Sequence, residues 1–163
     1  MDNERAARRA ARNQTRRLLW QWGMTLERIR KLEQERAEFR AMADDARRTL
    51  RSPNMSGMPR GGKSSDLSDV VVNVLRETDM YEEQVQRINT EIDSAIKLRN
   101  CIEDCVTQLP PVQERVLTYR YVDGRSWRFI AMKMNYAEEY VKDIDARAVD
   151  AVAGMIEIQT AHG

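Results

Sequence analysis

The side chains with the clearest binding chemistry lie near the C-terminus, between residues 137 and 152. If this stretch is a helix, one face of it carries charged and hydrogen-bonding groups. They are Glu138, Glu139, Lys142, Asp143 and Arg147, with Tyr140 beside them. Such groups suit recognition of a polar surface. Covalent chemistry has little support, because the single histidine, His162, stands near no nucleophile and leaves too few soft ligands for a metal. We expect no enzyme activity, no cofactor and no metal.

The residues before this helix have the spacing that two short, steeply crossing helices require. Ala131 is a small residue where two helix backbones would approach, and Asn135, four positions later, tolerates the positive φ of a tight turn. Val141 and Ile144 would point back toward Ala131. Ser126 can cap the first helix of the pair. The pattern predicts a helix-turn-helix.

In a helix-turn-helix, the second helix enters the major groove of double-stranded DNA. We therefore interpret the segment 137–152 as a recognition helix and the protein as a sequence-specific DNA-binding regulator. The predicted DNA-binding residues are Tyr140, Lys142, Asp143, Glu139, Arg147, Arg125 and Arg128.

The segment 109–153 resembles region 4 of sigma-70-type factors. The resemblance is carried by Leu109-Pro110, Arg115-Val116-Leu117, Arg120-Tyr121, Asp123-Gly124, Ile130-Ala131 and Arg147-Ala148. It implies a C-terminal three-helix domain and bacterial RNA polymerase as a further partner. Two departures stand out: Phe129 replaces the usual glutamate, and acidic residues, including Asp145, occupy positions where cations would favour phosphate.

A narrower resemblance links the chain to phage regulators of the ArpU and RinA kind. It is carried by the stretch MSGMPRGG at residues 55–62, by Ser126-Trp127 and by Tyr140-Val141. This resemblance implies a sigma-like activator of late genes in a phage or prophage, acting in the cytoplasm of the bacterial host.

The N-terminal segment 1–51 is basic and reads as one long helix or as two helices broken near Gly23. Its arginines could contact the phosphate backbone without reading sequence. The predicted contacts here are Arg8, Arg9, Arg12, Arg16 and Arg17. The first twenty or so residues also resemble the arginine-rich peptide of lambdoid N antiterminators. That resemblance implies RNA binding, with Trp20 or Trp22 as a stacking residue.

The segment 52–65 is rich in glycine, proline and serine and is predicted to be a linker. Gly57, Gly62, Lys63 and Ser64 satisfy the spacing of a phosphate-binding loop. Such a loop needs a buried strand before it, and here a charged helix comes before it. We expect Arg60 and Lys63 to contact DNA or an acidic partner instead.

The segment 66–108 has the most regular heptad pattern in the chain. Its apolar positions step by three and four from Val74 to Leu109. It holds 4 basic and 10 acidic residues, against 16 and 8 in residues 1–63. The two segments could therefore pair as an antiparallel coiled-coil hairpin, and association between copies would satisfy the same pattern. Arg99 at a seam position could select the register or the partner.

The predicted fold is thus all-α: a long helical hairpin, then a helix-turn-helix domain, and a tail at 154–163. No apolar run is long enough to span a membrane. Cys101 and Cys105 lie four residues apart on a helix and are expected to stay reduced. Two alternatives to transcription regulation remain: a small terminase subunit for DNA packaging, and an arginine-rich antiterminator that binds RNA. A homo-oligomer is expected for the transcription regulator and for the terminase subunit.

Overall fold

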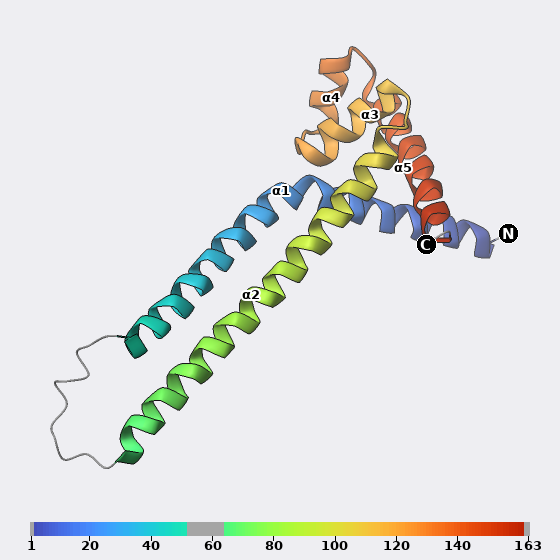
Figure 1. Cartoon of the computed structure of the whole chain (residues 1–163). Coiled ribbons are helices and arrows are strands. Elements are labelled where there is room, and N and C mark those ends of the chain that lie inside the picture. Colours follow the sequence, from blue (N-terminus) through green and yellow to red (C-terminus); the bar gives the residue numbers. More distant parts are fainter. Residues whose placement is uncertain (1, 52–63, 162–163) are drawn as a thin grey trace. The chain divides into compact units, whose positions relative to one another are not determined.

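The computed structural model describes residues 2–51 and 64–161, with side chains for 4–51 and 68–158 (Figure 1). All regular secondary structure in this part of the chain is helical, with short turns between helices and no strand, which confirms the predicted all-α class. The elements are α1 (Asp2–Arg51), α2 (Ser64–Val106), α3 (Pro111–Leu117), the π-helical turn η2 (Thr118–Val122), α4 (Trp127–Met134) and α5 (Glu138–Ala161).

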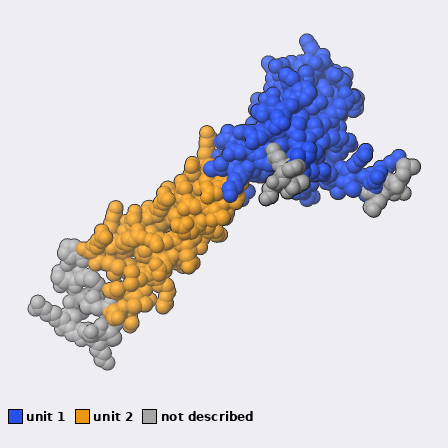
Figure 2. All heavy atoms as spheres, turned by 45° about the vertical axis from the view of Figure 1, so that its right-hand side comes forward, with its two compact units in different colours: residues 1–28, 95–163 blue, residues 29–94 orange. Residues whose placement is uncertain are grey.

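The chain divides into two compact units (Figure 2). Unit 1 combines residues 1–28 with residues 95–163, and unit 2 consists of residues 29–94. Each of the two long helices therefore contributes to both units. The segments predicted from the sequence followed helix boundaries, whereas the packing groups the first residues of the chain with the last.

Unit 2 is formed by the second half of α1 and most of α2, which run side by side (Figure 1). Leu32 of α1 packs with Ile88 and Ile92 of α2 in one buried cluster. The Arg36 side chain donates a hydrogen bond of 3.0 Å to Asn89 Oδ1. Further along α1, Phe39 contacts Tyr81 and Arg47 forms an ion pair with Glu82. Residue numbers that rise on α1 meet numbers that fall on α2, so the two segments are antiparallel. In unit 1, the Nε of Arg99 donates a hydrogen bond of 2.8 Å to Glu103 of the same helix.

Unit 1 is built on a core to which its N-terminal segment contributes directly. Leu19 of α1 is fully buried against Ile102 of α2 and Val149 and Val152 of α5. Trp22 packs at the edge of the same cluster. The apolar residues of α1 thus have a partner surface whose residues come about 80 to 130 positions later in the sequence. Residues 4–28 are therefore a structural part of the C-terminal unit.

Gly23 does not break α1, so the alternative of two helices was wrong. A Cβ atom built on Gly23 would lie 1.8 Å from the backbone oxygen of Tyr121 in η2. Glycine is needed here because the two backbones touch, and no side chain fits between them. The widened π-helical turn at Thr118–Val122 is the partner in this contact.

The helix ends differ from those predicted, and some predictions fall outside the described residues. The segment predicted as 66–108 forms a helix from Ser64 to Val106, and α5 continues to Ala161, through most of the segment predicted as a tail. Arg60, Lys63 and the loop-like pattern around them lie in residues 52–63, which the structure does not describe. None of the described helices has the length and apolar character needed to cross a membrane.

Candidate functional site

The junction between α4 and α5 is a tight turn with a defined hydrogen-bond pattern. Ser126 caps α4: its side chain accepts a hydrogen bond of 3.2 Å from the backbone N–H of Phe129. At the other end of α4, Asn135 has φ 58° and ψ 41°, the left-handed conformation predicted for it. The backbone N–H of Tyr136 donates to the carbonyl of Ala131 at 3.0 Å. The chain therefore leaves α4 in one fixed direction.

A second buried cluster holds these helices together. It consists of Val116 of α3, Ile130 and Ala131 of α4, and Val141 and Ile144 of α5. Tyr119, Trp127 and Met134 pack around it. All these apolar residues of α4 and α5 face inward, as their spacing predicted. The opposite side of α5 is consequently left to polar residues.

The first three turns of α5 expose most of the residues predicted to bind DNA. Glu139, Tyr140, Asp143 and Arg147 are exposed. The ring of Tyr140 lies edge-on to that of Tyr136, with 5.1 Å between centroids. This face combines an aromatic pair with charges of both signs.

The other residues predicted to bind DNA are Lys142, Arg125 and Arg128, and they differ in exposure and in the groups they contact. Lys142 is half-buried, and its ammonium group forms ion pairs with Glu138 at 2.9 Å and with Glu139 at 3.6 Å. The Glu138 hydrogen bond is the main reason that the pKa of Lys142 is raised. Arg125 and Arg128 are exposed near the start of α4, and the Arg125 guanidinium lies 4.9 Å from the centre of the Phe129 ring.

The N-terminal arginines divide into two groups. Arg12 forms an ion pair with Asp150, and Arg16 forms one of 3.2 Å with Asp145, so both bind α5. Arg8, Arg9 and Arg17 are exposed. Among the arginines of α1 predicted to contact phosphate, these three can bind a ligand without breaking either of the ion pairs that Arg12 and Arg16 form with α5.

Asp145 does not lie on the exposed face of α5, and that expectation was wrong. Its side chain is only 1% exposed. Burial raises the pKa of the Asp145 carboxyl group, and the charge of Arg16 acts in the opposite direction. The pKa of Asp150, by contrast, is lowered by its hydrogen bonds to Arg12. Tyr121, buried beside Asp145, has a raised pKa because of burial and because of that negative charge.

An arginine between two tryptophans is the main feature that sequence reasoning missed. The guanidinium carbon of Arg120 lies 4.4 Å from the ring centre of Trp127 and 5.3 Å from that of Trp20. Its Nη1 donates a hydrogen bond of 2.9 Å to the carbonyl of Arg125. Trp20 and Trp127 are 107 residues apart, so no local periodicity could relate them. The contact fixes the start of α4 against α1.

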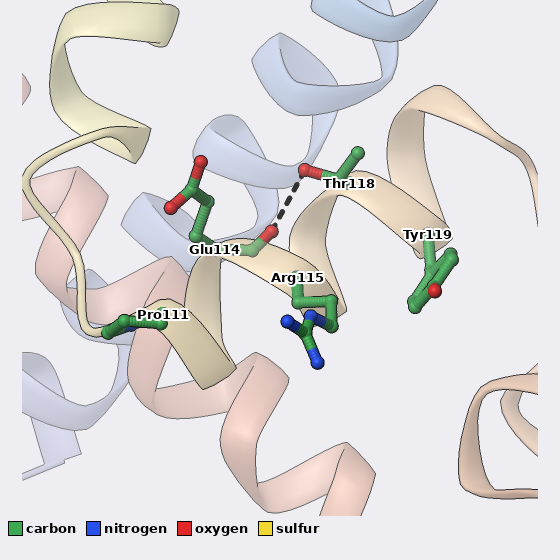
Figure 3. Close-up of a pocket in the computed structure, with 5 residues that line it drawn as sticks. All are labelled: Pro111, Glu114, Arg115, Thr118 and Tyr119. Atoms are coloured by element: carbon green, nitrogen blue, oxygen red, sulfur yellow. Dashed lines mark hydrogen bonds between the residues drawn. The ribbon is translucent and has the colours of Figure 1, made fainter. Parts of the chain in front are cut away.

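A separate hollow beside α3 and η2 offers less chemistry. It is lined by Pro111, Glu114, Arg115, Thr118 and Tyr119, and Figure 3 shows the Glu114 carboxylate and the Arg115 guanidinium pointing to different sides. The Thr118 hydroxyl donates to the backbone oxygen of Glu114 at 2.9 Å. No nucleophile is paired with a base there. Among the described residues, no cluster of three or more His, Cys, Asp or Glu side chains could hold a metal ion.

Comparison with protein-family models, curated proteins and solved structures found no match to this chain.

Proposed function

We propose that this protein is a sequence-specific DNA-binding regulator of transcription, in which α4 and α5 form a helix-turn-helix and α5 reads the major groove. The observation that carries the proposal is the left-handed conformation of Asn135 between α4 and α5, which pack against each other. Tyr140, Asp143 and Arg147 are exposed beyond this turn. A recognition helix needs its N-terminal turns accessible while its other side is held in a core. α5 meets both conditions.

Because the charge on this face of α5 is mixed, useful affinity for DNA would have to come from other parts of the protein as well. Arg147 is opposed by exposed acidic residues, including Glu139 and Asp143, so α5 alone attracts phosphate weakly. The exposed arginines Arg8, Arg9, Arg17, Arg125 and Arg128 could supply backbone attraction that is independent of sequence. Association of two or more copies through the long helices would place several reading helices at fixed spacing and multiply the affinity. The resemblance to phage sigma-like activators favours transcription as the process served.

The test is footprinting on the genomic DNA of the source and its phages with Tyr140→Ala and Arg147→Gln variants. Both side chains are exposed, so circular dichroism should stay unchanged, while each variant should weaken specific binding by about tenfold or more. Lys142 is not substituted in this test, because its ammonium group is already paired with Glu138 and Glu139. Arg30→Gln, which removes an exposed charge in unit 2, is the matched control. Protection that is equal in all variants would contradict the proposed reading face.

The mass of the purified protein separates transcription from packaging. A dimer or another small oligomer supports the regulator, and a closed ring of many subunits would favour a small terminase subunit. Binding of an RNA hairpin in place of duplex DNA would favour an antiterminator. The pairing of Arg12 and Arg16 with α5 argues against that last alternative, because two of the arginines are already engaged.

A further inference from the structure

A hollow in unit 1 is walled by side chains from α1, η2, α4 and α5. Three of these side chains are cationic, two are tryptophans and one is a buried carboxylate. They are Arg16, Trp20, Arg120, Trp127, Lys142 and Asp145, and Tyr121 completes the wall. The hollow adjoins the proposed reading helix, because Lys142 belongs to both. Residues of α1 meet here three consecutive elements that lie about 100 or more residues later in the sequence, so the hollow is a built feature of the fold.

The cations of the hollow are held in place before any ligand arrives. Arg120 lies over the rings of Trp127 and Trp20 and is anchored through Nη1. Within the described residues, this is its one hydrogen bond, so its other nitrogens can still donate. Fixed guanidinium groups lose little rotamer entropy on binding, and their planar N–H groups match the oxygens of phosphate.

The geometry of its ion pair with Asp145 leaves Arg16 able to bind a ligand while it still stabilises the fold. The ion pair is single: Nη2 of Arg16 reaches Oδ2 of Asp145 at 3.2 Å. The second oxygen, Oδ1, is buried and accepts no hydrogen bond within the described part of the chain. Because the pairing is not bidentate, Arg16 keeps N–H groups for another acceptor, and its side chain is 40% exposed toward solvent.

We propose that this hollow binds a phosphate group, and that the natural ligand is a phosphodiester of the duplex read by α5. Lys142 is already paired with Glu138 and Glu139, so the attraction for an anion comes from Arg16 and Arg120, which face the single carboxylate of Asp145. A stacked nucleobase fits less well, because the Arg120 guanidinium already lies over both indole rings. The identity of this ligand rests on the proposed function, whereas the phosphate chemistry of the site does not.

The three tryptophans of the chain provide a specific readout. Trp20 and Trp127 line the hollow, and Trp22 packs against the core cluster of unit 1. The full-length chain, labelled with ¹⁵N, is titrated with inorganic phosphate and, at matched ionic strength, with chloride. Phosphate should shift the indole N–H signals of Trp20 and Trp127 in a saturable manner and leave that of Trp22 in place. Chloride should shift none of them. Equal shifts for all three signals, or no shift with phosphate, would overturn the proposal.

Variants then assign the shift to the arginine. Arg120→Gln should abolish it, and Arg30→Gln, which removes one charge from unit 2, should leave it unchanged. If Arg120→Gln loses helicity, Arg120→Lys replaces it. Lysine keeps the charge but lacks the planar fork, and it should weaken phosphate binding by about tenfold. An unaltered affinity in the lysine variant would contradict the site.

A second arm with duplex DNA separates this proposal from the proposed function. On a footprinted duplex, the wild-type chain should show the same indole shifts, and Arg120→Gln should lower the slope of log binding constant against log salt by about one. Shifts with inorganic phosphate but no protected DNA would support the hollow and defeat the regulator. Protected DNA with an unchanged salt slope and no indole shift would defeat the hollow and leave the regulator standing.

Discussion

Single residues decide whether the helices of unit 1 can approach one another, and two glycines provide a matched comparison. Gly23 faces the backbone of Tyr121 with no room for a Cβ atom, whereas a Cβ on Gly154 in α5 would meet nothing within 4 Å. The same substitution should therefore have opposite effects at the two sites.

Gly23→Ala is expected to lower the free energy of unfolding by about 2 to 3 kcal/mol, because the helix must move away from η2. Gly154→Ala should raise it by up to about 1 kcal/mol through helix propensity. Urea denaturation followed by circular dichroism measures both. A stabilising Gly23→Ala would show that α1 does not need this close approach.

Two buried or paired carboxylates of α5 should respond to pH with opposite signs. The pKa of Asp145 is raised by burial, so the folded state holds its proton at a pH where the unfolded chain has released it. Its contribution to stability is present at low pH and is lost as pH rises above the ordinary Asp value. The pKa of Asp150 is lowered by Arg12, so its contribution is present above that value and is lost as pH falls through the lowered pKa.

The test is the free energy of unfolding from about pH 3 to pH 7 for the wild type, Asp145→Asn and Asp150→Asn. The difference between wild type and Asp145→Asn should shift against the wild type as pH rises. For Asp150→Asn, it should shift in favour of the wild type, but by a small amount, because the Arg12–Asp150 pair is largely exposed. Parallel pH profiles for the two variants would contradict the assigned environments.

At the scale of elements, the spacing of residues in the sequence correctly predicted the features that depend only on neighbouring positions. The three-and-four spacing from Val74 to Leu109 correctly located the buried side of α2, and the residues around Asn135 correctly indicated the turn between α4 and α5. The tertiary role of α1 could not be predicted this way. Arg16 and Asp145 each look like solvated charges in their own helices, and only their packing shows that they meet. Gly23 carried a signal, but a helix break and a close backbone contact both favour glycine.

At the scale of the whole molecule, the stability of the C-terminal unit depends on the N-terminal residues. Leu19 is completely buried in the core that α5 helps to form. Thr15, one turn earlier, is 4% exposed. Deleting residues 1–17, which would otherwise test a DNA-contacting arm, therefore removes packing as well as charge. Substitution of the exposed Arg8 and Arg9 by glutamine is the cleaner test of that arm.

Leu19→Ala is expected to cost about 2 to 5 kcal/mol, because it leaves a cavity in the core. The loss should reach α5, about 130 residues away in sequence. Hydrogen exchange of amide protons in residues 144–152 should therefore accelerate in this variant. Leu26→Ala, at a side chain that is 51% exposed on the same helix, is the control and should leave the exchange unchanged. Unchanged protection of α5 in Leu19→Ala would show that α1 is not part of this core.

This shared core has a consequence for biosynthesis. Residues 4–28 leave the ribosome before residues 95–163, which supply the surface that covers Leu19. Unit 1 can close only after α5 has emerged, and until then the apolar side of residues 4–28 stays uncovered. A nascent chain that stops before α5 should therefore remain a client of chaperones, and the surface proposed to meet DNA can form only once α5 has been translated.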